Sequence, residues 1–409
     1  MNSWNDKAYA LFEEQQQARG IDLDAVKTQF KALKIETPSW GYGDSGTRFK
    51  VFKKVGVPRN PYEKLDDAAI VNNLTGACPK VAIHIPWDKV DDYEHLKNHA
   101  KSLGLTLGAV NPNLFQDDVY MLGSVCNSDA RIRKKATDHL LECVEIMKQV
   151  DSDVLSLWFA DGTNYPGQGS FRARKQWLFE ALLEAYQKLA PNMRMLIEYK
   201  MFEPGFYHTD LADWGTAFLM ATKLGTQAQV LVDLGHHALG TNVEHIVATL
   251  LDEEKLGGFH FNSRKYADDD LIVGTTNPYE LFLIFAQILD AAHDSQAGIV
   301  KTANEIAYMI DQSHAIEPKI PATLRSVINI QTQYAKALLI DTNGLRKAQE
   351  NNDVLRAEAI MKEAFEFDVS VLLRVIREEA GLPVDLIQAF YDSGYQESIA
   401  NRGIGGASW

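Results

Sequence analysis

The sequence has little cysteine, no long apolar run and no excess of positive charge. Three cysteines occur among 409 residues (Cys78, Cys126 and Cys143), and no two of them have CxxC spacing. An odd number of scattered cysteines argues against a disulfide framework and is typical of reduced thiols, so we expect a cytoplasmic protein. No stretch approaches the ~18 uninterrupted apolar residues of a membrane span, and the polar N-terminus has no apolar signal-peptide core. We therefore expect no membrane partner.

The net charge is −14, which disfavours nucleic acid as a partner because an acidic chain does not attract a phosphate backbone. The sequence has no P-loop, no HExxH and no convincing GxSxG motif. The segment GYGDSG (41–46) matches G-x-G-x-x-G, but a weak strand precedes it and no clear apolar helix follows. We interpret this segment as a flexible loop and not as a dinucleotide site.

Short apolar runs alternate with longer helical patterns along most of the chain. Strands that alternate with helices indicate βαβ units and a parallel sheet. Seven runs are clear and one, near IETPSW, is weak, which makes eight: 35–40, 81–85, 105–110, 154–159, 193–198, 229–233, 257–261 and 306–311. Eight units predict an α/β fold of the (β/α)₈ TIM-barrel type, although periodicity alone does not exclude a doubly wound open sheet.

Helical patterns flank this region on both sides. We expect an N-terminal helical segment over 1–34, the barrel as catalytic domain over 35–316, and a C-terminal helical extension over 317–409. The extension would pack on the barrel or on a neighbouring subunit. Within the barrel, Ser128 and Ser170 are the expected N-caps of two helices.

Polar side chains stand at the ends of four consecutive predicted strands. In a barrel these ends converge on the C-terminal mouth, where the active sites of this fold lie. The residues at these ends and in the loops that follow are Glu198, Lys200, Asp233, His236, His260, Asp268, Asp269, Asp270 and Asp311.

A divalent cation would explain why acids repeatedly end apolar strands, because an acid in a dry core is otherwise costly. Oxygen ligands together with imidazole suit Mn²⁺, Mg²⁺, Co²⁺ or Zn²⁺. A single strand-terminal Asp more often caps the next helix, and a lone His is more often a hydrogen-bonded core residue, but four successive strands favour metal. Two ligand sets are predicted, with a shared carboxylate as an option: Glu198, Asp233, His260 and Asp311; and His236, Asp268 and Asp270.

Earlier strands supply aromatic and hydrogen-bonding groups. His84 lies on VAIHIPWD, Asn111 follows LTLGAV, and Trp158 ends VLSLWFADG. Aromatic walls with a few donors suit a sugar, which offers C–H faces and hydroxyls. For Trp158, core packing is the alternative.

These residues, in this order, resemble the L-rhamnose isomerases, a family of xylose-isomerase-like TIM barrels. The resemblance is clearest over EYKMFEP, LVDLGHHALGTNVE, GFHFNSRKYADDDL and MIDQSH, and looser over WGYGDSGTRF, VAIHIPWD and LWFADGTNYPGQ. It covers roughly residues 35 to 340. It implies a homotetramer with two divalent ions per subunit, Mn²⁺ being the usual activator.

The resemblance also implies roles for individual residues. A structural metal would be held by Glu198, Asp233, His260 and Asp311, and a catalytic metal by His236, Asp268 and Asp270. Lys200 would lie near the sugar O1. His84, Phe115 and Trp158 would line the pocket, and Phe49 would reach into a neighbouring subunit's site. We assign catalytic roles to Lys200, Asp311 and His236.

The predicted reaction interconverts L-rhamnose and L-rhamnulose by a metal-assisted 1,2-hydride shift, with L-lyxose, L-mannose and D-allose (giving D-psicose) as further substrates. An enediol route would need a side-chain base near C2, and Glu198 is taken up as a ligand. The alternatives are a ketose 3-epimerase, which would use two glutamates as paired bases, an abasic-site endonuclease, and a metal-stabilised scaffold without activity.

Overall fold

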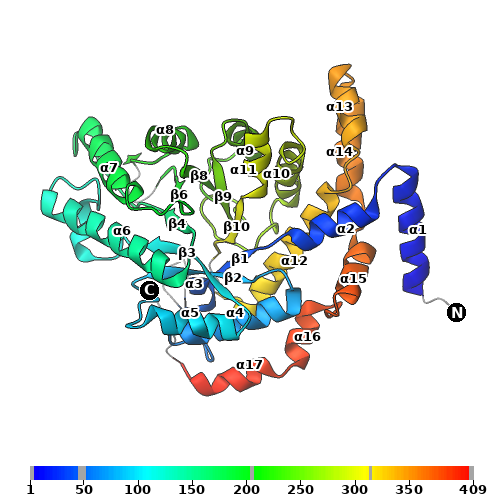
Figure 1. Cartoon of the computed structure of the whole chain (residues 1–409), viewed down its shortest axis with the longest axis horizontal. Coiled ribbons are helices and arrows are strands. Elements are labelled where there is room, and N and C mark those ends of the chain that lie inside the picture. The colour runs from blue at the N-terminus through cyan, green and yellow to red at the C-terminus, as the bar shows by residue number, and fades with distance from the viewer. Residues whose placement is uncertain (1–3, 45–51, 203–206, 313–315, 405–409) are drawn as a thin grey trace.

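Eight parallel strands close into a barrel surrounded by helices (Figure 1). The computed structural model describes residues 4–44, 52–202, 207–312 and 316–404. Around the barrel the strands follow the order β1 (Glu36–Pro38), β10 (Ala307–Ile310), β9 (Leu256–Phe261), β8 (Ala228–Asp233), β6 (Arg194–Glu198), β4 (Val154–Leu157), β3 (Thr106–Pro112) and β2 (Lys80–Ile85). A separate antiparallel pair, β5 (Gly162–Thr163) and β7 (His208–Thr209), lies outside the barrel sheet.

All eight predicted runs overlap a barrel strand, including the weak one. β1 pairs with β2 through Thr37 and Val81 and with β10 through Glu36 and Met309. Because the first strand pairs with the last, the sheet is closed, and the open doubly wound alternative is wrong. The TIM-barrel prediction is confirmed.

The segment after β1 differs from the predicted flexible loop. Residues Ser39–Tyr42 form a short helix, α3, and are buried. The Tyr42 hydroxyl donates a hydrogen bond to Thr37 Oγ1 over 3.1 Å, which ties the helix back to the strand. The loop interpretation is therefore wrong for residues 41–42, and residues 45 and 46 of the same motif lie outside the described residues.

Most of the remaining helices form the outer ring of the barrel. They are α4 (Pro61–Thr75), α5 (Tyr93–Ser102), α6 (Ala130–Val150), α7 (Phe171–Tyr186), α8 (Trp214–Leu224), α9 (Val243–Asp252), α10 (Pro278–Ala291), α11 (Ala297–Asn304) and α12 (Lys319–Ala337), with the 3₁₀ helix η1 (Asp118–Leu122) between β3 and α6. Ser170 caps α7 as predicted. For α6 the predicted cap Ser128 is wrong, because the carboxylate of Asp129 accepts a hydrogen bond from Arg131 N over 2.8 Å. A carboxylate is favoured there since it also meets the positive end of the helix dipole.

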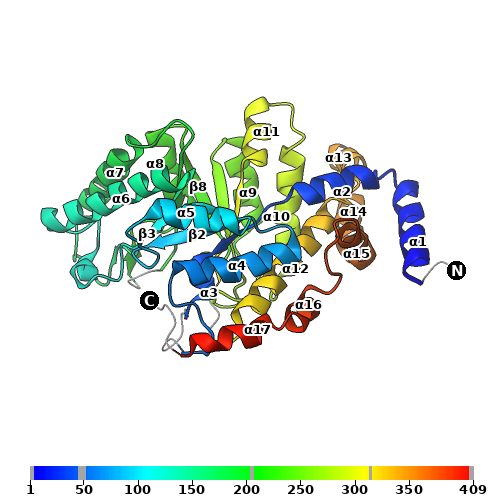
Figure 2. The same cartoon turned by 60° about the horizontal axis from the view of Figure 1, so that its bottom comes forward.

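The N-terminal helices and the first helices of the C-terminal extension lie together on one side of the barrel (Figure 2). The N-terminal helices are α1 (Trp4–Ala18) and α2 (Leu23–Ala32), and the C-terminal ones are α13 (Thr342–Glu350), α14 (Val354–Glu366), α15 (Ser370–Glu379), α16 (Leu386–Asp392), α17 (Tyr395–Ser398) and η2 (Ile399–Arg402). Lys27 and Lys31 of α2 pair with Glu379 of α15 over 2.7 and 2.8 Å. α12 contacts both α10 and α4 and so completes the ring. The three-part division of the chain stays a prediction.

Within the described residues, none of the helices combines the length and the apolar character that a membrane crossing requires.

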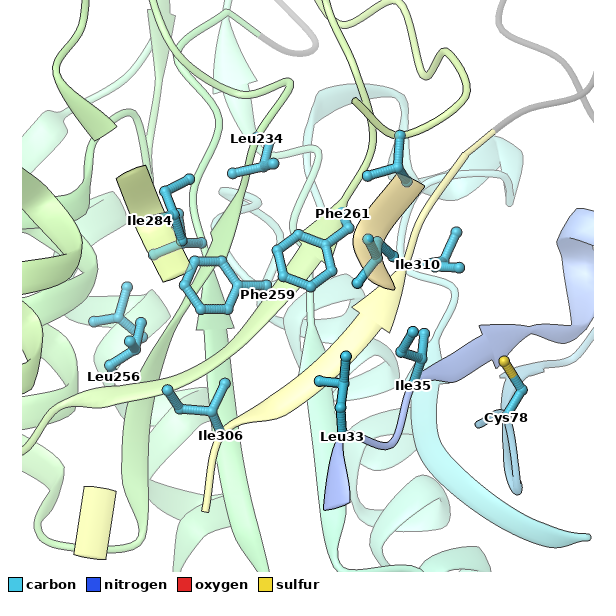
Figure 3. Close-up of a cluster of buried hydrophobic side chains, with 14 of the residues drawn as sticks. Leu33, Ile35, Cys78, Leu234, Leu256, Phe259, Phe261, Ile284, Ile306 and Ile310 are labelled. Carbon is cyan, nitrogen blue, oxygen red and sulfur yellow. The ribbon is translucent and has the colours of Figure 1, made fainter. Parts of the chain in front are cut away.

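Side chains along β9 point alternately to the core and to the inside of the barrel, and this alternation places a site residue. Phe259 and Phe261 point outward into the apolar layer between the strands and helices, and their stacked rings lie 5.1 Å apart (Figure 3). Ile284 of α10 belongs to the same buried layer. Because successive side chains of a strand point to opposite faces, His260 between the two phenylalanines points into the barrel.

Candidate metal centre and substrate pocket

Four strand ends bring the first predicted ligand set together. Glu198 and Asp233 are the last residues of β6 and β8, His260 lies near the end of β9, and Asp311 follows β10. One possible ligand atom from each of the four residues lies within 4.8 Å of the others. The predicted convergence of these strands at the C-terminal mouth is therefore present in the structure.

The second group overlaps the first. Asp233, His236 and Asp268 also offer ligand atoms within 4.8 Å of one another, so Asp233 is the carboxylate that both groups contain. Asp270 lies outside both groups but is buried in the lining of the same pocket. Asp269 turns away, and its carboxylate accepts hydrogen bonds from the backbone N–H groups of Lys265 and Tyr266.

Hydrogen bonds from neighbouring groups hold these side chains in orientation. Asp233 accepts from Asn262 Nδ2 over 2.9 and 3.1 Å and from Gly235 N over 2.6 Å. His236 Nδ1 lies 3.0 Å from the carbonyl oxygen of Tyr199, which leaves its Nε2 facing Asp268 Oδ1 at 3.5 Å. Partners of this kind fix the ring orientation and tautomer of metal-binding histidines.

The cluster contains buried polar atoms that converge without hydrogen-bonding each other. His260 Nδ1 lies 3.2 Å from Glu198 Oε1, 3.5 Å from Asp311 Oδ2 and 3.9 Å from Asp233 Oδ2. Neither this nitrogen nor Asp268 Oδ1 has a hydrogen-bond partner in the described part of the chain. Unpaired buried ligand atoms are costly unless something binds them, and a divalent cation fits a donor set of carboxylates and imidazoles.

The charges of the cluster perturb one another strongly in the metal-free protein. Burial would raise the pKa of Glu198, but the positive charges of His260 and His236 outweigh burial and lower it to about 2. Burial raises the pKa of Asp233 to about 7. For His260, burial opposes the charged form, yet the nearby Glu198 and Asp311 carboxylates raise its pKa to about 9. A bound cation would replace these protons as the positive charge between the carboxylates.

A cavity of about 400 Å³ lies above the cluster. Its floor is the ligand groups, and its wall is aromatic. His84 stacks on Trp87 at 3.8 Å, Phe115 meets Trp158 edge-on at 4.8 Å, and Lys200 Nζ lies 5.1 Å from the centre of the Trp158 ring.

The structure thus places the predicted pocket residues His84, Phe115, Trp158 and Lys200 in one cavity. Trp158 belongs to the pocket wall and not to the buried core, so the core-packing alternative is wrong. Phe49 lies outside the described residues.

Asn111, expected to supply a hydrogen-bonding group, lines the cavity, and so do residues that were not assigned from the sequence, among them Trp40, Ser156 and Phe202. Trp40 is the most informative, because its indole Nε1 donates a hydrogen bond to Asp311 Oδ1 over 2.9 Å. Its position directly after the first strand was the available signal, since every strand end contributes to the mouth.

A larger cavity, of about 940 Å³, lies at the opposite end of the barrel. It is lined by a mixture of acids and bases from the starts of the strands, such as Glu36, Lys80 and Arg194. It contains neither ligand group, and the active sites of TIM barrels lie at the other end.

Comparison with known proteins agrees with this architecture. The family described as "Xylose isomerase-like TIM barrel" matches residues 75–300, more than half of the chain. The chain belongs to this family. A similar protein of Rhizobium meliloti (strain 1021) is named "Probable sugar isomerase". It is 43% identical to this chain, over 93% of this chain and 89% of its own length.

A second "Probable sugar isomerase", from Mesorhizobium japonicum, is 40% identical over 97% of this chain and 92% of its own length. Among solved structures, that of an L-ribulose 3-epimerase is similar, with a TM-score of 0.52 and 12% sequence identity. The match covers 81% of this chain and 97% of the epimerase chain. At that identity the structural match supports the barrel fold alone.

Proposed function

We propose that the protein is a metal-dependent aldose–ketose isomerase that interconverts L-rhamnose and L-rhamnulose. The observation that carries this proposal is the pair of overlapping ligand groups that share Asp233 beneath an aromatic wall with one lysine. Relatives named as sugar isomerases at 40% and 43% identity support the class of activity. L-lyxose, L-mannose and D-allose are proposed as further substrates.

The proposed metal content is two divalent ions per subunit, Mn²⁺ first and Co²⁺, Mg²⁺ or Zn²⁺ as alternatives. Glu198, Asp233, His260 and Asp311 would hold one ion, and His236, Asp268 and Asp233 the other, with Asp270 beside them. When bound, such ions polarise the sugar carbonyl and stabilise negative charge on the neighbouring oxygen.

Lys200 supplies a fixed positive charge at the mouth. Its Nζ lies 2.7 Å from Asp268 Oδ2, and both side chains are largely buried. In this position the ammonium group would donate a hydrogen bond to the sugar O1 as negative charge develops there, an interaction that is strong in a site with little water. With a sugar bound, the aromatic wall would exclude water from the reacting carbons, which would favour direct hydride transfer from C2 to C1.

Asp311 is the ligand most open to the substrate space. Its side chain is 29% exposed, whereas those of Glu198 and Asp233 are 2% and 0% exposed. In the metal-free protein, burial and nearby carboxylates raise the pKa of Asp311; with a cation bound, its carboxylate would be deprotonated and could accept a proton. We assign it the transfer of the hydroxyl proton from O2 to O1, which balances the hydride shift from C2 to C1. His84, whose pKa burial lowers well below 6.5, would meet the sugar as a neutral ring.

The second candidate is a ketose 3-epimerase. That reaction needs two bases on opposite faces of the substrate, and Glu198 is the only glutamate among the described residues that line the pocket. It lies between two histidines, 3.2 Å from each. In the described part of the lining, the wall of His84, Trp87, Phe115 and Trp158 carries no carboxylate. These observations favour the isomerase.

The test is to dialyse the protein against chelator, add back Mn²⁺, and follow ketose formation from L-rhamnose, L-lyxose and D-allose. We expect metal to restore ketose formation, fastest with L-rhamnose. Asp233→Asn should abolish it, and Asp91→Asn, at an exposed position, should not. Incubation of the ketose L-rhamnulose in D₂O separates the candidates, because a hydride shift retains the transferred hydrogen whereas a 3-epimerase exchanges the C3 hydrogen, which is acidic next to the C2 carbonyl of a ketose. Exchange at C3 without ketose formation would overturn the proposal.

We also infer a cytoplasmic homotetramer. The three cysteines are buried and unpaired, which supports a reducing compartment. Light scattering coupled to gel filtration would measure the oligomeric state, and a monomer would contradict this inference.

A further inference from the structure

Asp88 is a fully buried carboxylate that three different elements contact. Its side chain has 0% exposure, and Lys64 Nζ of α4 donates to its Oδ1 over 2.6 Å. Its Oδ2 accepts from the backbone N–H of His84 on β2 over 2.8 Å and from the hydroxyl of Ser39, directly after β1. In return, the Asp88 N–H donates to the carbonyl oxygen of His84 over 2.7 Å.

The groups that Asp88 holds lead directly to the pocket. His84 and Trp87 flank the turn that Asp88 closes, and their rings stack at 3.8 Å with an angle of 24°. Ser39 precedes Trp40, whose indole donates to Asp311 over 2.9 Å and meets the His84 ring edge-on at 5.5 Å. The Asp88 carboxylate, which lies outside the pocket, therefore connects the end of β2 with the end of β1. The end of β2 carries His84 of the aromatic wall, and Trp40 after β1 orients Asp311.

Stability alone does not account for this arrangement. Lys64 is 3% exposed, and a buried ion pair loses so much solvation that a well-packed apolar pair is often at least as stable. An apolar residue at 88 would, however, leave the His84 N–H and the Ser39 hydroxyl without their acceptor. A carboxylate held by a lysine presents one oxygen to Lys64 and leaves the other aimed at both donors.

We propose that Asp88, held by Lys64, is a positioning residue that sets the geometry of the substrate-facing wall. The proposal deepens the function proposed above and rests on it for its kinetic test. Asp88 acts through His84, Trp87 and Trp40 and does not line the cavity itself. Without its acceptor, the turn at His84 would move and the stacked pair would no longer present a fixed surface to the sugar.

The experiment compares two double variants with the same charge. Lys64→Met/Asp88→Asn removes the ion pair but keeps an oxygen for the His84 N–H and Ser39, whereas Lys64→Met/Asp88→Ala removes that oxygen as well. Asp88→Asn alone would leave Lys64 as an unpaired buried cation and is expected to fold poorly, which is why both variants also replace the lysine. Thermal unfolding first establishes that both doubles fold.

We expect Lys64→Met/Asp88→Asn to keep the wild-type KM for L-rhamnose. Lys64→Met/Asp88→Ala should raise the KM about tenfold, which corresponds to the loss of about one hydrogen bond, and should change kcat less. Equal KM values in two folded doubles would overturn the proposal, since a purely structural Asp88 would change their melting temperatures only.

A readout without substrate keeps this test independent of the proposed reaction. Acrylamide should quench Trp87 fluorescence more strongly in the alanine double than in the asparagine double, with Trp87→Phe versions of both to assign the signal. If the wild-type enzyme converts none of the sugars, the proposed function fails, and the quenching difference still decides the role of Asp88. Identical quenching of Trp87 in both doubles would refute it.

Discussion

Removing the metal should make the stability of the protein fall as the pH rises. In the metal-free site, burial opposes the charged form of His260, but the neighbouring carboxylates, Glu198 first, raise its pKa from 6.5 to about 9. The pKa of His236 is also raised well above 6.5 by Asp233 and Asp268, against the effect of burial. Folding therefore takes up protons at both rings. Their stabilising contribution is fully present below the unfolded pKa of about 6.5 and is lost as the pH rises through about 9.

The size of the effect follows from the His260 shift alone. A pKa raised from 6.5 to about 9 corresponds to about 3 kcal/mol, at ~1.4 kcal/mol for each factor of ten. With an unfolding entropy of about 2.1 cal/mol/K per residue, a chain of 409 residues has about 0.9 kcal/mol/K in total. The melting temperature of the metal-free protein should thus fall by about 3–4 °C between pH 6.5 and 9.

The assay is thermal unfolding at both pH values, with chelator or with excess Mn²⁺ under argon. Because metal binds the deprotonated ligands, its stabilising effect should grow with pH, and the difference between metal-bound and metal-free melting temperatures should widen. His260→Gln should reduce the pH effect and leave the part that His236 contributes, whereas His95→Gln, at an exposed position, should leave the effect unchanged. A metal-free melting temperature that stays constant or rises across this range would refute the reasoning.

Three further perturbations test other parts of the structure. Lys200→Met should lower kcat/KM by about 10²–10³-fold, as loss of a donor to developing negative charge does, while titration shows that Mn²⁺ still binds; an unchanged kcat/KM would rule out the assigned role. Trp40→Phe removes the indole donor to Asp311 and should weaken Mn²⁺ binding by about 10-fold or more, and equal affinity would show that this hydrogen bond does not orient the ligand. Arg174→Ala leaves the carboxylate of Asp210 buried without its partner at 2.8 Å, so the free energy of unfolding should fall by about 3–5 kcal/mol in a urea titration, with Arg131→Ala as an exposed control; equal losses in both would contradict the burial argument.

The barrel itself could be predicted because its strands are short, apolar and regularly spaced. β9 is the clearest example, since Phe259 and Phe261 mark one face and His260 the other. β1 has only three residues and contains a proline, so its pattern was weak. The weak run was counted as the eighth, and it was the count of eight runs that predicted a barrel, since Glu36–Pro38 has no strong strand signal of its own.

The positions of the ligands followed from the fold, but their mutual contacts did not. Any acid at the end of a barrel strand reaches the mouth, so Glu198, Asp233 and Asp311 could be grouped before the structure was known. The hydrogen bond from Trp40 to Asp311 joins residues 271 positions apart and exists only because the barrel closes between β1 and β10. The choice of Asp233 as the shared carboxylate likewise depends on distances of a few ångströms that sequence spacing does not contain.

The N-cap of α6 was missed because the sequence pattern does not contain the backbone geometry of the turn. Ser128 and Asp129 are adjacent and both suit an N-cap, so the pattern placed the start of α6 to within one residue and could not decide between them. That choice depends on the backbone angles at the turn, which the preceding loop sets.

Closure between β1 and β10 also determines the order in which the protein can be completed during synthesis. β1 leaves the ribosome early, yet its second neighbour, which pairs Glu36 with Met309, is made some 270 residues later. Until then β1 and β9 are edge strands with unpaired N–H and C=O groups, the kind of edge that other chains can join. The shortness of β1 limits this exposure on one side, because three residues offer a poor template for another strand. A weak first strand is thus a disadvantage for prediction and a protection for the nascent chain.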